Sequence, residues 1–197
     1  MIPTRARSYS SGIFRFFRNF DSSGGYAVTE FVIPSEIHRS DILSYAAEVR
    51  ASDNEFDGSA GLGEFDSYAL WLERLRLLAS DKAEKYGYYR TFVYLAYDSG
   101  RLVGIVSARI TDDSFVTTYA GHIGYHVRPS CRRMGYGKQL LTFAADVCRK
   151  NGISVPVVCT DPGNLPSQRT ALSCGFVPAG EVNYRDERRI LRFEAAD

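Results

Sequence analysis

The sequence lacks most of the features that would mark a nucleic-acid-binding, membrane-spanning or metal-binding protein. Its 24 basic and 23 acidic side chains nearly cancel, so the net charge of +1 provides no overall field that would attract nucleic acid or a membrane surface. No apolar run approaches the roughly 20 residues that a membrane-spanning helix needs. The four cysteines form no Cys-x-x-Cys pair, and no cluster of histidines accompanies them, which argues against a metal site. Isolated cysteines of this kind predict reduced thiols in a cytoplasmic protein.

Acidic residues are also missing from the first 20 positions, which hold four arginines and four phenylalanines. The arginines interrupt the apolar run and no small-residue cleavage site follows, so a secretory signal is not expected. We interpret residues 1–28 as an N-terminal arm whose phenylalanines pack on the rest of the chain or on a second copy in a homodimer. An organellar transit peptide is the alternative. The remaining residues, 29–197, are expected to form one domain.

Strand-like and helix-like patterns alternate through that domain. Strands are predicted at 29–33, 90–97, 102–110, 120–127, 153–159, 182–184 and 188–193. Helices are predicted to follow the caps Ser40–Asp41 and Asp66–Ser67, to include Leu140 and end at Asn151–Gly152, and to follow Pro166. The order β-α-α-β-β-β-α-β-α-β-β predicts a mixed α/β fold, with a mostly antiparallel sheet and helices on both faces. The strand–helix–strand unit around Gly135 implies one parallel pair of strands.

A glycine-bearing loop lies between the predicted strand 120–127 and the helix that contains Leu140. It reads Arg132-Arg-Met-Gly135-Tyr-Gly137. The first N–H groups of a helix have no partner inside the helix, and the helix dipole places partial positive charge there. Glycine also lets an anion approach the main chain closely. The loop therefore predicts a phosphate-binding site at the start of this helix.

Two common phosphate-binding motifs do not fit this loop. A Walker A loop would need Gly-x-x-x-x-Gly-Lys-(Ser/Thr), but Gly137-Lys138 is followed by Gln139. A dinucleotide fingerprint would need a third glycine, and that position is Leu140.

A second block of residues supports a different assignment. Asp161-Pro-Gly-Asn164-Leu-Pro-Ser167 precedes a short helix-like run and Cys174-Gly-Phe176. Together, the Arg-x-x-Gly-x-Gly loop and the Asn…Ser…Gly-Phe block resemble the GNAT N-acetyltransferase superfamily over roughly residues 29 to 195. The stretch Gly-His-Ile-Gly-Tyr…Arg-Pro-Ser, from Gly121 to Ser130, is most similar to a bacterial group of predicted acetyltransferases.

This resemblance implies the GNAT fold, in which two central parallel strands splay apart and acyl-CoA enters between them. Here those strands would be 120–127 and 153–159. It implies acetyl-CoA as co-substrate, with the pyrophosphate on the main chain of Arg133, Met134, Gly135, Tyr136, Gly137 and Lys138 and with Arg132 at the first loop position. The backbone of Tyr125 and Val127 would pair with the pantetheine arm, and Asn164 and Ser167 would also contact the cofactor. No metal is implied.

The catalytic groups follow less directly. His122 lies near the position where many relatives carry a glutamate base, and its ordinary pKa suits proton removal at neutral pH. A hydrogen-bonded sheet residue is the alternative role for His122 and for His126. Many relatives place a tyrosine seven residues after the asparagine as the acid for the thiolate, but this position is Ala171. Tyr184 or Tyr136 could serve instead, or the thiolate could leave without a dedicated acid.

These features predict an N-acetyltransferase that transfers an acetyl group from acetyl-CoA directly to a primary amine of a small molecule or peptide. The acidic loop, residues 53–66, contains five acidic side chains and no basic one, so a cationic amine would be favoured if this loop borders the acceptor entrance. The alternative, motivated by Ala171 and by the aromatic arm, is a non-catalytic acyl-CoA-binding sensor or scaffold domain.

Overall fold

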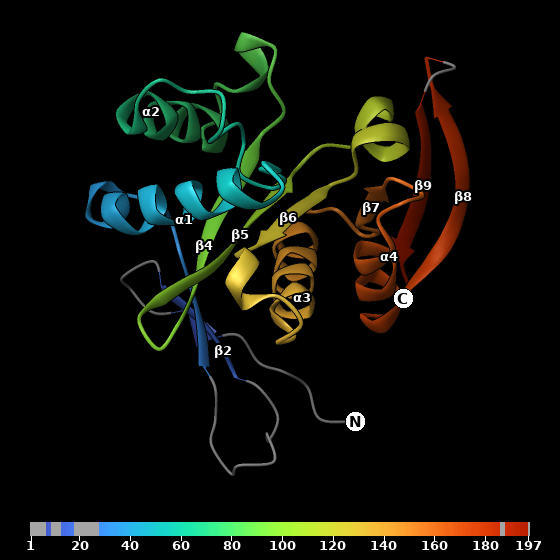
Figure 1. The fold of residues 1–197 in the computed structure, drawn as a ribbon. Helices are drawn as coiled ribbons and strands as arrows, with labels where there is room; N and C mark the ends of the chain where they lie inside the picture. The colour runs from blue at the N-terminus through green and yellow to red at the C-terminus, as the bar shows by residue number, and fades with distance from the viewer. Residues whose placement is uncertain (1–6, 9–12, 18–27, 186–187, 197) are drawn as a thin grey trace.

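The computed structural model describes residues 7–8, 13–17, 28–185 and 188–196. Its elements follow the predicted order, preceded by two additional strands (Figure 1). The strands are β1 (Arg7–Ser8), β2 (Ile13–Phe17), β3 (Val28–Val32), β4 (Thr91–Asp98), β5 (Arg101–Arg109), β6 (Ile123–Val127), β7 (Val157–Thr160), β8 (Phe176–Tyr184) and β9 (Arg188–Ala195). The helices are α1 (Arg39–Ser52), α2 (Tyr68–Ala79), α3 (Tyr136–Lys150) and α4 (Leu165–Ser173). Short helical turns are η1 (Glu36–His38), η2 (Glu84–Tyr86), η3 (Val116–Ala120) and η4 (Pro129–Cys131).

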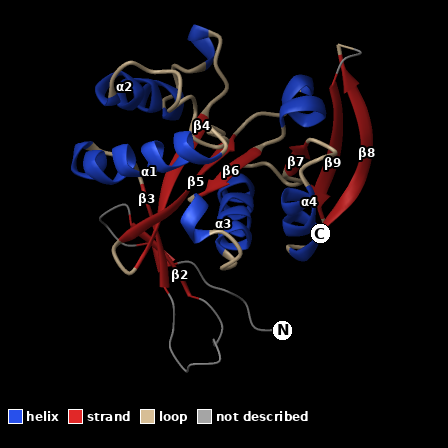
Figure 2. Cartoon of the chain, in the orientation of Figure 1, coloured by secondary structure: helices blue, strands red, loops and turns tan. Residues whose placement is uncertain are grey.

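The strands form two sheets, coloured red in Figure 2. The first has six strands in the order β1-β2-β3-β4-β5-β6, and the second has three in the order β7-β9-β8. Every hydrogen-bonded pair in both sheets is antiparallel. The predicted mixed α/β class with a mostly antiparallel sheet is therefore confirmed.

Only part of the predicted N-terminal arm is described. β2 pairs with β3, with Ile13 opposite Val32, so this part of the arm extends the main sheet. Its sequence, Ile-Phe-Arg-Phe-Phe, is rich in residues that favour strands, which was the available signal. Residues 1–6, 9–12 and 18–27 of the predicted arm lie outside the described part of the chain. The boundary between arm and domain at residue 28 stays a prediction.

Helices cover both faces of the six-stranded sheet, and side-chain alternation along β4 creates a core on each face. Val93 and Leu95 pack with α1 and α2 around the buried Trp71, whereas Tyr94 and Ala96 pack against α3. Figure 1 shows α1 and α2 on one side of this sheet and α3 on the other. Two cores on opposite faces fix the position of β6 between α1 and α3.

The helix boundaries follow local capping chemistry. The Ser67 side chain accepts the Leu70 N–H at 3.3 Å, which confirms the predicted start of α2. α3 ends at Lys150, and Gly152 follows with a φ of +96°, as the predicted stop requires. The predicted cap at Ser40–Asp41 is wrong, because η1 leads straight into α1, which begins at Arg39.

The two sheets meet between β6 and β7, where the sequence predicts a splayed strand pair. His122 N–H donates to the Val157 carbonyl at 2.7 Å, and Val157 N–H donates to His122 Nδ1 at 3.0 Å. His122 directly precedes β6 and Val157 is the first residue of β7, and among the described residues no ladder between the two strands continues beyond these bonds. The strands are shorter than predicted because Gly121 turns the chain with a φ of +71° and Pro156 stays outside β7.

Candidate functional site

The glycine-bearing loop leads from β6 into α3, where the sequence predicts it. Arg133 has a φ of +62° and Gly135 a φ of +82°, and Gly135 is the residue that precedes the helix. Gly135 has no side chain that could cap this end of α3, and the helix dipole places partial positive charge there. The loop therefore has the local geometry of an anion site.

The side chains of this loop point in different directions. Arg133, Met134 and Lys138 are exposed. Tyr136 is buried, and its hydroxyl donates to Asp98 Oδ2 at 2.6 Å. This hydrogen bond is made at the turn between β4 and β5, so the Tyr136 hydroxyl serves packing of α3 and is not free to act as an acid.

The two sheets separate between β6 and β7, and we call this place the sheet division. The register between β5 and β6 determines which main-chain groups of β6 face it. Arg109 N–H donates to the His122 carbonyl and Arg128 N–H donates to the Val103 carbonyl, each at 2.8 Å. Bonded pairs alternate in an antiparallel ladder, so even-numbered residues bond to β5. Odd-numbered residues, among them the predicted pantetheine partners 125 and 127, turn their main-chain groups away from β5 and toward β7.

The second predicted block lies across this division, at the start of α4. Asn164 Oδ1 accepts the Ser167 N–H at 3.1 Å and caps the helix. Ser167 Oγ lies 3.3 Å from the Tyr125 hydroxyl, which links α4 to β6. A Cβ added at Gly137 would lie 3.6 Å from the Tyr125 ring. Tyr125 therefore joins the three segments that carry the predicted cofactor contacts: β6, the start of α3 and the start of α4.

His122 is fully buried, and both of its ring nitrogens have partners. Nε2 lies 3.0 Å from the Thr111 carbonyl, and Nδ1 accepts the Val157 N–H. A carbonyl accepts only, so Nε2 carries the proton and Nδ1 is the acceptor. Burial lowers the pKa of His122, which keeps the ring neutral. These contacts match the alternative role of a hydrogen-bonded sheet residue and argue against His122 as the base.

His126 lies within β6, four residues after His122, and its side chain points toward α1. Its Nδ1 lies 2.6 Å from the Tyr45 hydroxyl, and its Nε2 lies 2.8 Å from Arg132 Nη2. Arg132 also forms a short ion pair with Asp53. The first residue of the glycine-bearing loop is thereby connected to the first residue of the acidic loop.

Tyr184 is the second tyrosine, after Tyr136, that the sequence offers in place of the acid missing at Ala171. Ala171 is fully buried and carries no hydroxyl. Tyr184 lies on β8, where its ring centroid is 5.3 Å from that of Tyr119 and 5.8 Å from that of Phe115. Its ring contacts among the described residues are with this aromatic cluster and with Arg185, and none of these residues belongs to α3 or α4. The Tyr125 hydroxyl, by contrast, contacts Ser167 of α4.

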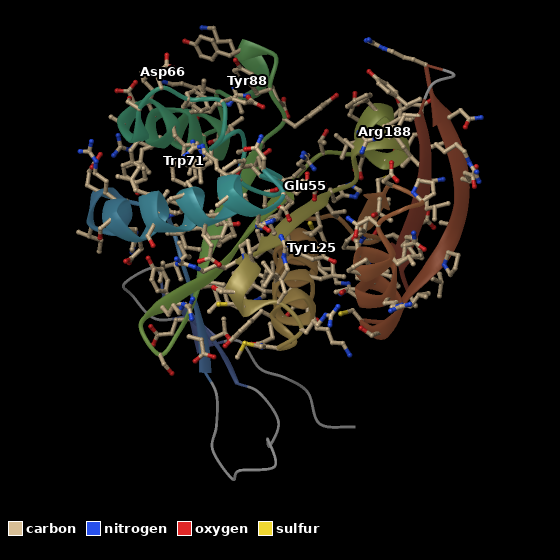
Figure 3. The ribbon with its side chains drawn as sticks, viewed as in Figure 1. Glu55, Asp66, Trp71, Tyr88, Tyr125 and Arg188 are labelled. Atoms are coloured by element: carbon tan, nitrogen blue, oxygen red, sulfur yellow. The ribbon has the colours of Figure 1, made fainter. Side chains whose placement is uncertain are left out.

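The acidic loop lies against β6 in its first half only. A Cβ added at Gly58 would lie 2.3 Å from the Gly124 carbonyl oxygen, and Trp71 Nε1 donates to the Ser59 carbonyl at 2.8 Å. Figure 3 shows Glu55 at the end of α1, whereas Asp66 lies beside α2. The five acidic side chains of the loop therefore do not form one cluster.

The charge of Asp57, an acidic residue of this loop, affects the pKa values of several groups around β6. Burial raises the pKa values of Tyr45 and Tyr125, and the Asp57 charge raises them further. The same charge opposes the lowering effect of burial on the pKa values of Arg109 and His126. Groups on β5, β6 and α1 thus all sense this carboxylate, which is itself exposed.

A salt bridge joins α1 to the turn that follows β6. Arg128 Nε donates to Glu48 Oε2 at 2.5 Å, and Ser130 N–H donates to Glu48 Oε1 at 2.6 Å. Burial alone raises the pKa of Glu48, but the hydrogen bonds from Ser130 and Arg128 outweigh it and bring the pKa to about 2. The carboxylate therefore stays ionised and holds the segment that enters the glycine-bearing loop.

Other kinds of site find no support in the described residues. None of the helices there is long and apolar enough to cross a membrane. No group of three or more metal-binding side chains gathers in that part of the chain either.

Comparison with known proteins agrees with the geometry. The microcin C7 self-immunity acetyltransferase, solved with acetyl-CoA and AMP, is 15% identical, with a TM-score of 0.62 over 86% of this chain and 92% of that chain. The ribosomal-protein-S5-alanine acetyltransferase from Vibrio fischeri is 16% identical, with a TM-score of 0.60 over 90% and 94%. RimJ from Mycobacterium smegmatis, solved with CoA-disulfide, is 17% identical, with a TM-score of 0.62 over 85% and 81%. At these identities the likeness establishes the fold alone.

Sequence comparison establishes the family. No curated protein matches the sequence at a significant level. The model of the acetyltransferase (GNAT) family matches residues 55–176, which is more than half of the chain and includes the glycine-bearing loop and the Asn164 block. The chain therefore belongs to the GNAT family of acetyltransferases.

Proposed function

We propose that the protein transfers an acetyl group from acetyl-CoA to a primary amine of a small molecule or peptide. The observation that supports this most is the juxtaposition of the helix N-terminus that follows Gly135, at the start of α3, with the β6 main chain that faces away from β5. The first can accept a diphosphate, and the second offers the hydrogen bonds that an extended amide-containing arm requires.

In this proposal the main chain of residues 133–138 binds the pyrophosphate of the cofactor. The main-chain groups of Tyr125 and Val127 pair with the pantetheine arm, and the start of α4, at Asn164 and Ser167, contacts the arm from the other side of the division. A main-chain N–H of β6 polarises the thioester carbonyl and stabilises the oxyanion that forms when the amine attacks.

The acceptor amine must lose a proton before it attacks. An alkylammonium with a pKa near 10.4 is less than about 0.1% neutral at pH 7. His122 offers no free ring nitrogen for this task. We therefore assign proton loss to solvent as the amine enters the site and not to a dedicated base. On this assignment kcat/KM rises with pH up to the pKa of the amine and shows no inflection near the ordinary pKa of histidine.

The departing thiolate needs a proton or a hydrogen bond. We assign this role to the Tyr125 hydroxyl, in place of Tyr184 or Tyr136. It lies at the junction of β6, α3 and α4, and its Ser167 partner can donate or accept. Burial raises the pKa of Tyr125, so the hydroxyl keeps its proton at neutral pH.

The acceptor class follows from charge and from the structural neighbours. The exposed carboxylates Glu55 and Asp57 beside β6 favour a cationic amine. Several of the similar structures are named as acetyltransferases of ribosomal proteins, which supports including an exposed peptide amine among the acceptors. The second candidate function, a non-catalytic acyl-CoA sensor, is favoured by one observation only: α4 carries the buried Ala171 where many relatives have an acidic hydroxyl.

Two measurements test the proposal. Calorimetry with CoA measures binding, and release of free thiol from acetyl-CoA in the presence of an amine panel measures turnover. Binding with turnover supports the transferase, whereas binding without turnover of any amine supports the sensor. No binding at millimolar CoA would overturn both.

The glycine before α3 provides a matched pair of variants. Gly135→Val places a side chain beside the loop amides, so we expect the Kd for CoA to rise at least about tenfold, or ~1.4 kcal/mol. Gly152→Val is the control, because Gly152 has a similar positive φ at the other end of α3 and open space around its Cβ position. Both variants suffer backbone strain of about 1–2 kcal/mol, but only the first should lose CoA. Equal losses of CoA affinity would show that helix strain, and not the anion site, is responsible.

A further inference from the structure

The Arg132 guanidinium is engaged with protein groups on the side of the loop toward α1. Nη2 pairs with Asp53 and lies 2.8 Å from His126 Nε2, and Nε lies 3.4 Å from the Val127 carbonyl oxygen. The Asp53 charge offsets that of the guanidinium. The side chain at the first position of the glycine-bearing loop is thus occupied before any phosphate arrives.

These contacts also fix the state of His126. Arginine has no acceptor, so Nε2 of the imidazole must accept, and the ring proton lies on Nδ1. Nδ1–H then donates to the Tyr45 hydroxyl, 2.6 Å away. Tyr45 and His126 are buried, so this chain of contacts continues from the loop into the body of α1.

Asp53 begins a short segment, residues 53–59, that crosses β6. Its far end is held by the core, since Trp71 Nε1 donates to the Ser59 carbonyl. Its middle is pressed onto the strand, because a Cβ at Gly58 would overlap the Gly124 carbonyl. Its near end is held by Arg132. Between these supports lie Glu55 and Asp57, the two carboxylates assigned to the acceptor amine.

We infer that Arg132 is a positioning residue for acceptor binding: through Asp53 it holds segment 53–59 on β6, and so it links the cofactor loop to the acceptor side. The inference rests on the proposed function, since it assumes CoA at residues 133–138. Phosphate binding orders the main chain around Arg132, which in turn restricts Asp53 and the carboxylates that follow it. The cofactor and the acceptor then bind with positive coupling.

Hydrogen exchange of peptides covering residues 53–59 provides a test that does not need the acceptor. In the unchanged protein, saturating CoA should slow exchange in this segment. In Arg132→Met the segment should exchange faster without CoA, and the CoA-dependent slowing should be lost. Arg76→Met is the control, because Arg76 is exposed on α2 and remote from the loop. Calorimetry establishes CoA binding for each variant first.

Kinetics test the same link, because its loss should raise the KM for the acceptor and leave the Kd for CoA nearly unchanged. Arg132→Met and Asp53→Asn should each raise the KM for a cationic amine about tenfold, with the Kd for CoA changed less than about threefold. The double variant should resemble either single variant, because both remove the same link. If Arg132→Met does not fold, Arg132→Lys, which keeps the charge but not the fork, takes its place.

The outcomes separate the inference from the proposed function. Failure of the unchanged protein to bind CoA overturns the proposed function. CoA binding with unchanged exchange at residues 53–59 in Arg132→Met, or with additive effects of the two substitutions, overturns the inference alone. A loss of CoA affinity as large as the rise in acceptor KM would return Arg132 to a direct phosphate contact.

Discussion

At the scale of single residues, two histidines show how neighbours decide chemistry. His126 lies in β6 and His122 directly precedes it, and both have a pKa lowered by burial. Each has its two nitrogens engaged, one with main-chain groups and the other with side chains. Their shared property is neutrality, which lets a sheet place imidazoles in its interior without the cost of a buried charge.

The buried neutral state of His122 predicts a pH dependence of stability. Its pKa in the folded protein is below the ordinary 6.5, so the unfolded chain binds a proton that the folded chain excludes as the pH falls below about 6.5. Stability should therefore decline on acidification. His122→Asn should be less stable at pH 7.5 by about 1–3 kcal/mol, because two hydrogen bonds are lost. It should also lose less stability between pH 7.5 and 5.5, although His126 still contributes.

Denaturant unfolding of both proteins at the two pH values measures this. Parallel declines would show that His122 does not carry the proton linkage. The same variant also tests the absence of a histidine base, since an acidic limb in kcat/KM that disappears with His122 would restore it as the base.

Tyr125→Phe isolates the hydroxyl that we assign to the leaving thiolate. The ring and its packing against Gly137 stay, so CoA affinity and Tm should change little. We expect kcat to fall about 100-fold, the lower end of the range for loss of one acid–base group. Ser167→Ala is the control, because it removes the hydrogen-bond partner and keeps the tyrosine. Turnover of Tyr125→Phe equal to that of the unchanged protein would mean that the thiolate leaves without a dedicated acid.

The sequence could not indicate the role of Tyr125. Its position in an alternating strand predicts only which face it covers, and a tyrosine there is usually core. Its hydroxyl becomes a site group because α4, some 40 residues later, returns to the same place and brings Ser167. The glycine-bearing loop, by contrast, was predictable, because its chemistry depends on adjacent residues and on the start of one helix.

At the scale of elements, periodicity identified every helix of eight or more residues and every long strand from residue 28 onward. It missed what depends on partners or on unusual backbone. η3 is a five-residue π-helical turn, which has no simple sequence signal, and the predicted strand 120–127 consequently begins at Ile123. β8 begins at Phe176, six residues before the predicted start, because Phe176 already pairs with Ala195 at the end of β9. Pairing, and not local propensity, sets these boundaries.

The salt bridge between α1 and the end of β6 gives an element-scale prediction. Glu48→Gln leaves the mostly buried Arg128 without its carboxylate and weakens the support of Ser130. We expect the free energy of unfolding to fall by about 1–3 kcal/mol and the Kd for CoA to rise severalfold, because the following loop is less well held. Glu73→Gln, on the exposed face of α2, should change neither. Thermal unfolding with calorimetry measures both, and an unchanged Kd would separate this contact from the cofactor loop.

At the scale of the whole molecule, the balanced net charge conceals an uneven local distribution. The cofactor loop is basic on its exposed side, at Arg133 and Lys138, and the segment across β6 is acidic, at Glu55 and Asp57. The two substrates that we propose carry the complementary charges: the cofactor diphosphate is negative and the acceptor amine is positive. Composition alone therefore excluded a strong general field but could not reveal that each side of the site is matched to its own substrate.

Salt should expose this arrangement. The KM for a diamine should rise between low and physiological ionic strength, whereas the KM for a neutral amine should not, because exposed charges are screened beyond about 8 Å at 0.15 M. Substitution of Glu55 and Asp57 by the amides should raise the KM for the diamine more than it lowers kcat. Substitution of Glu73 and Glu84 on and beyond α2 provides the comparison at equal net charge. A preference for neutral or anionic amines, with no effect of salt on kcat/KM, would contradict the acidic assignment.

The strand order of the smaller sheet has a consequence for how the protein is made. β9 lies between β7 and β8, so Cys159 pairs with Arg192, and Val177 pairs with Glu194. A chain that leaves the ribosome N-terminal end first must therefore expose β7 without a partner until residues 188–195 emerge. The six-stranded sheet and the anion site can form earlier, but the second wall of the cofactor site cannot. We expect ribosome-bound chains that stop before residue 188 to remain sensitive to protease between β7 and β8, and to become resistant once β9 has been released.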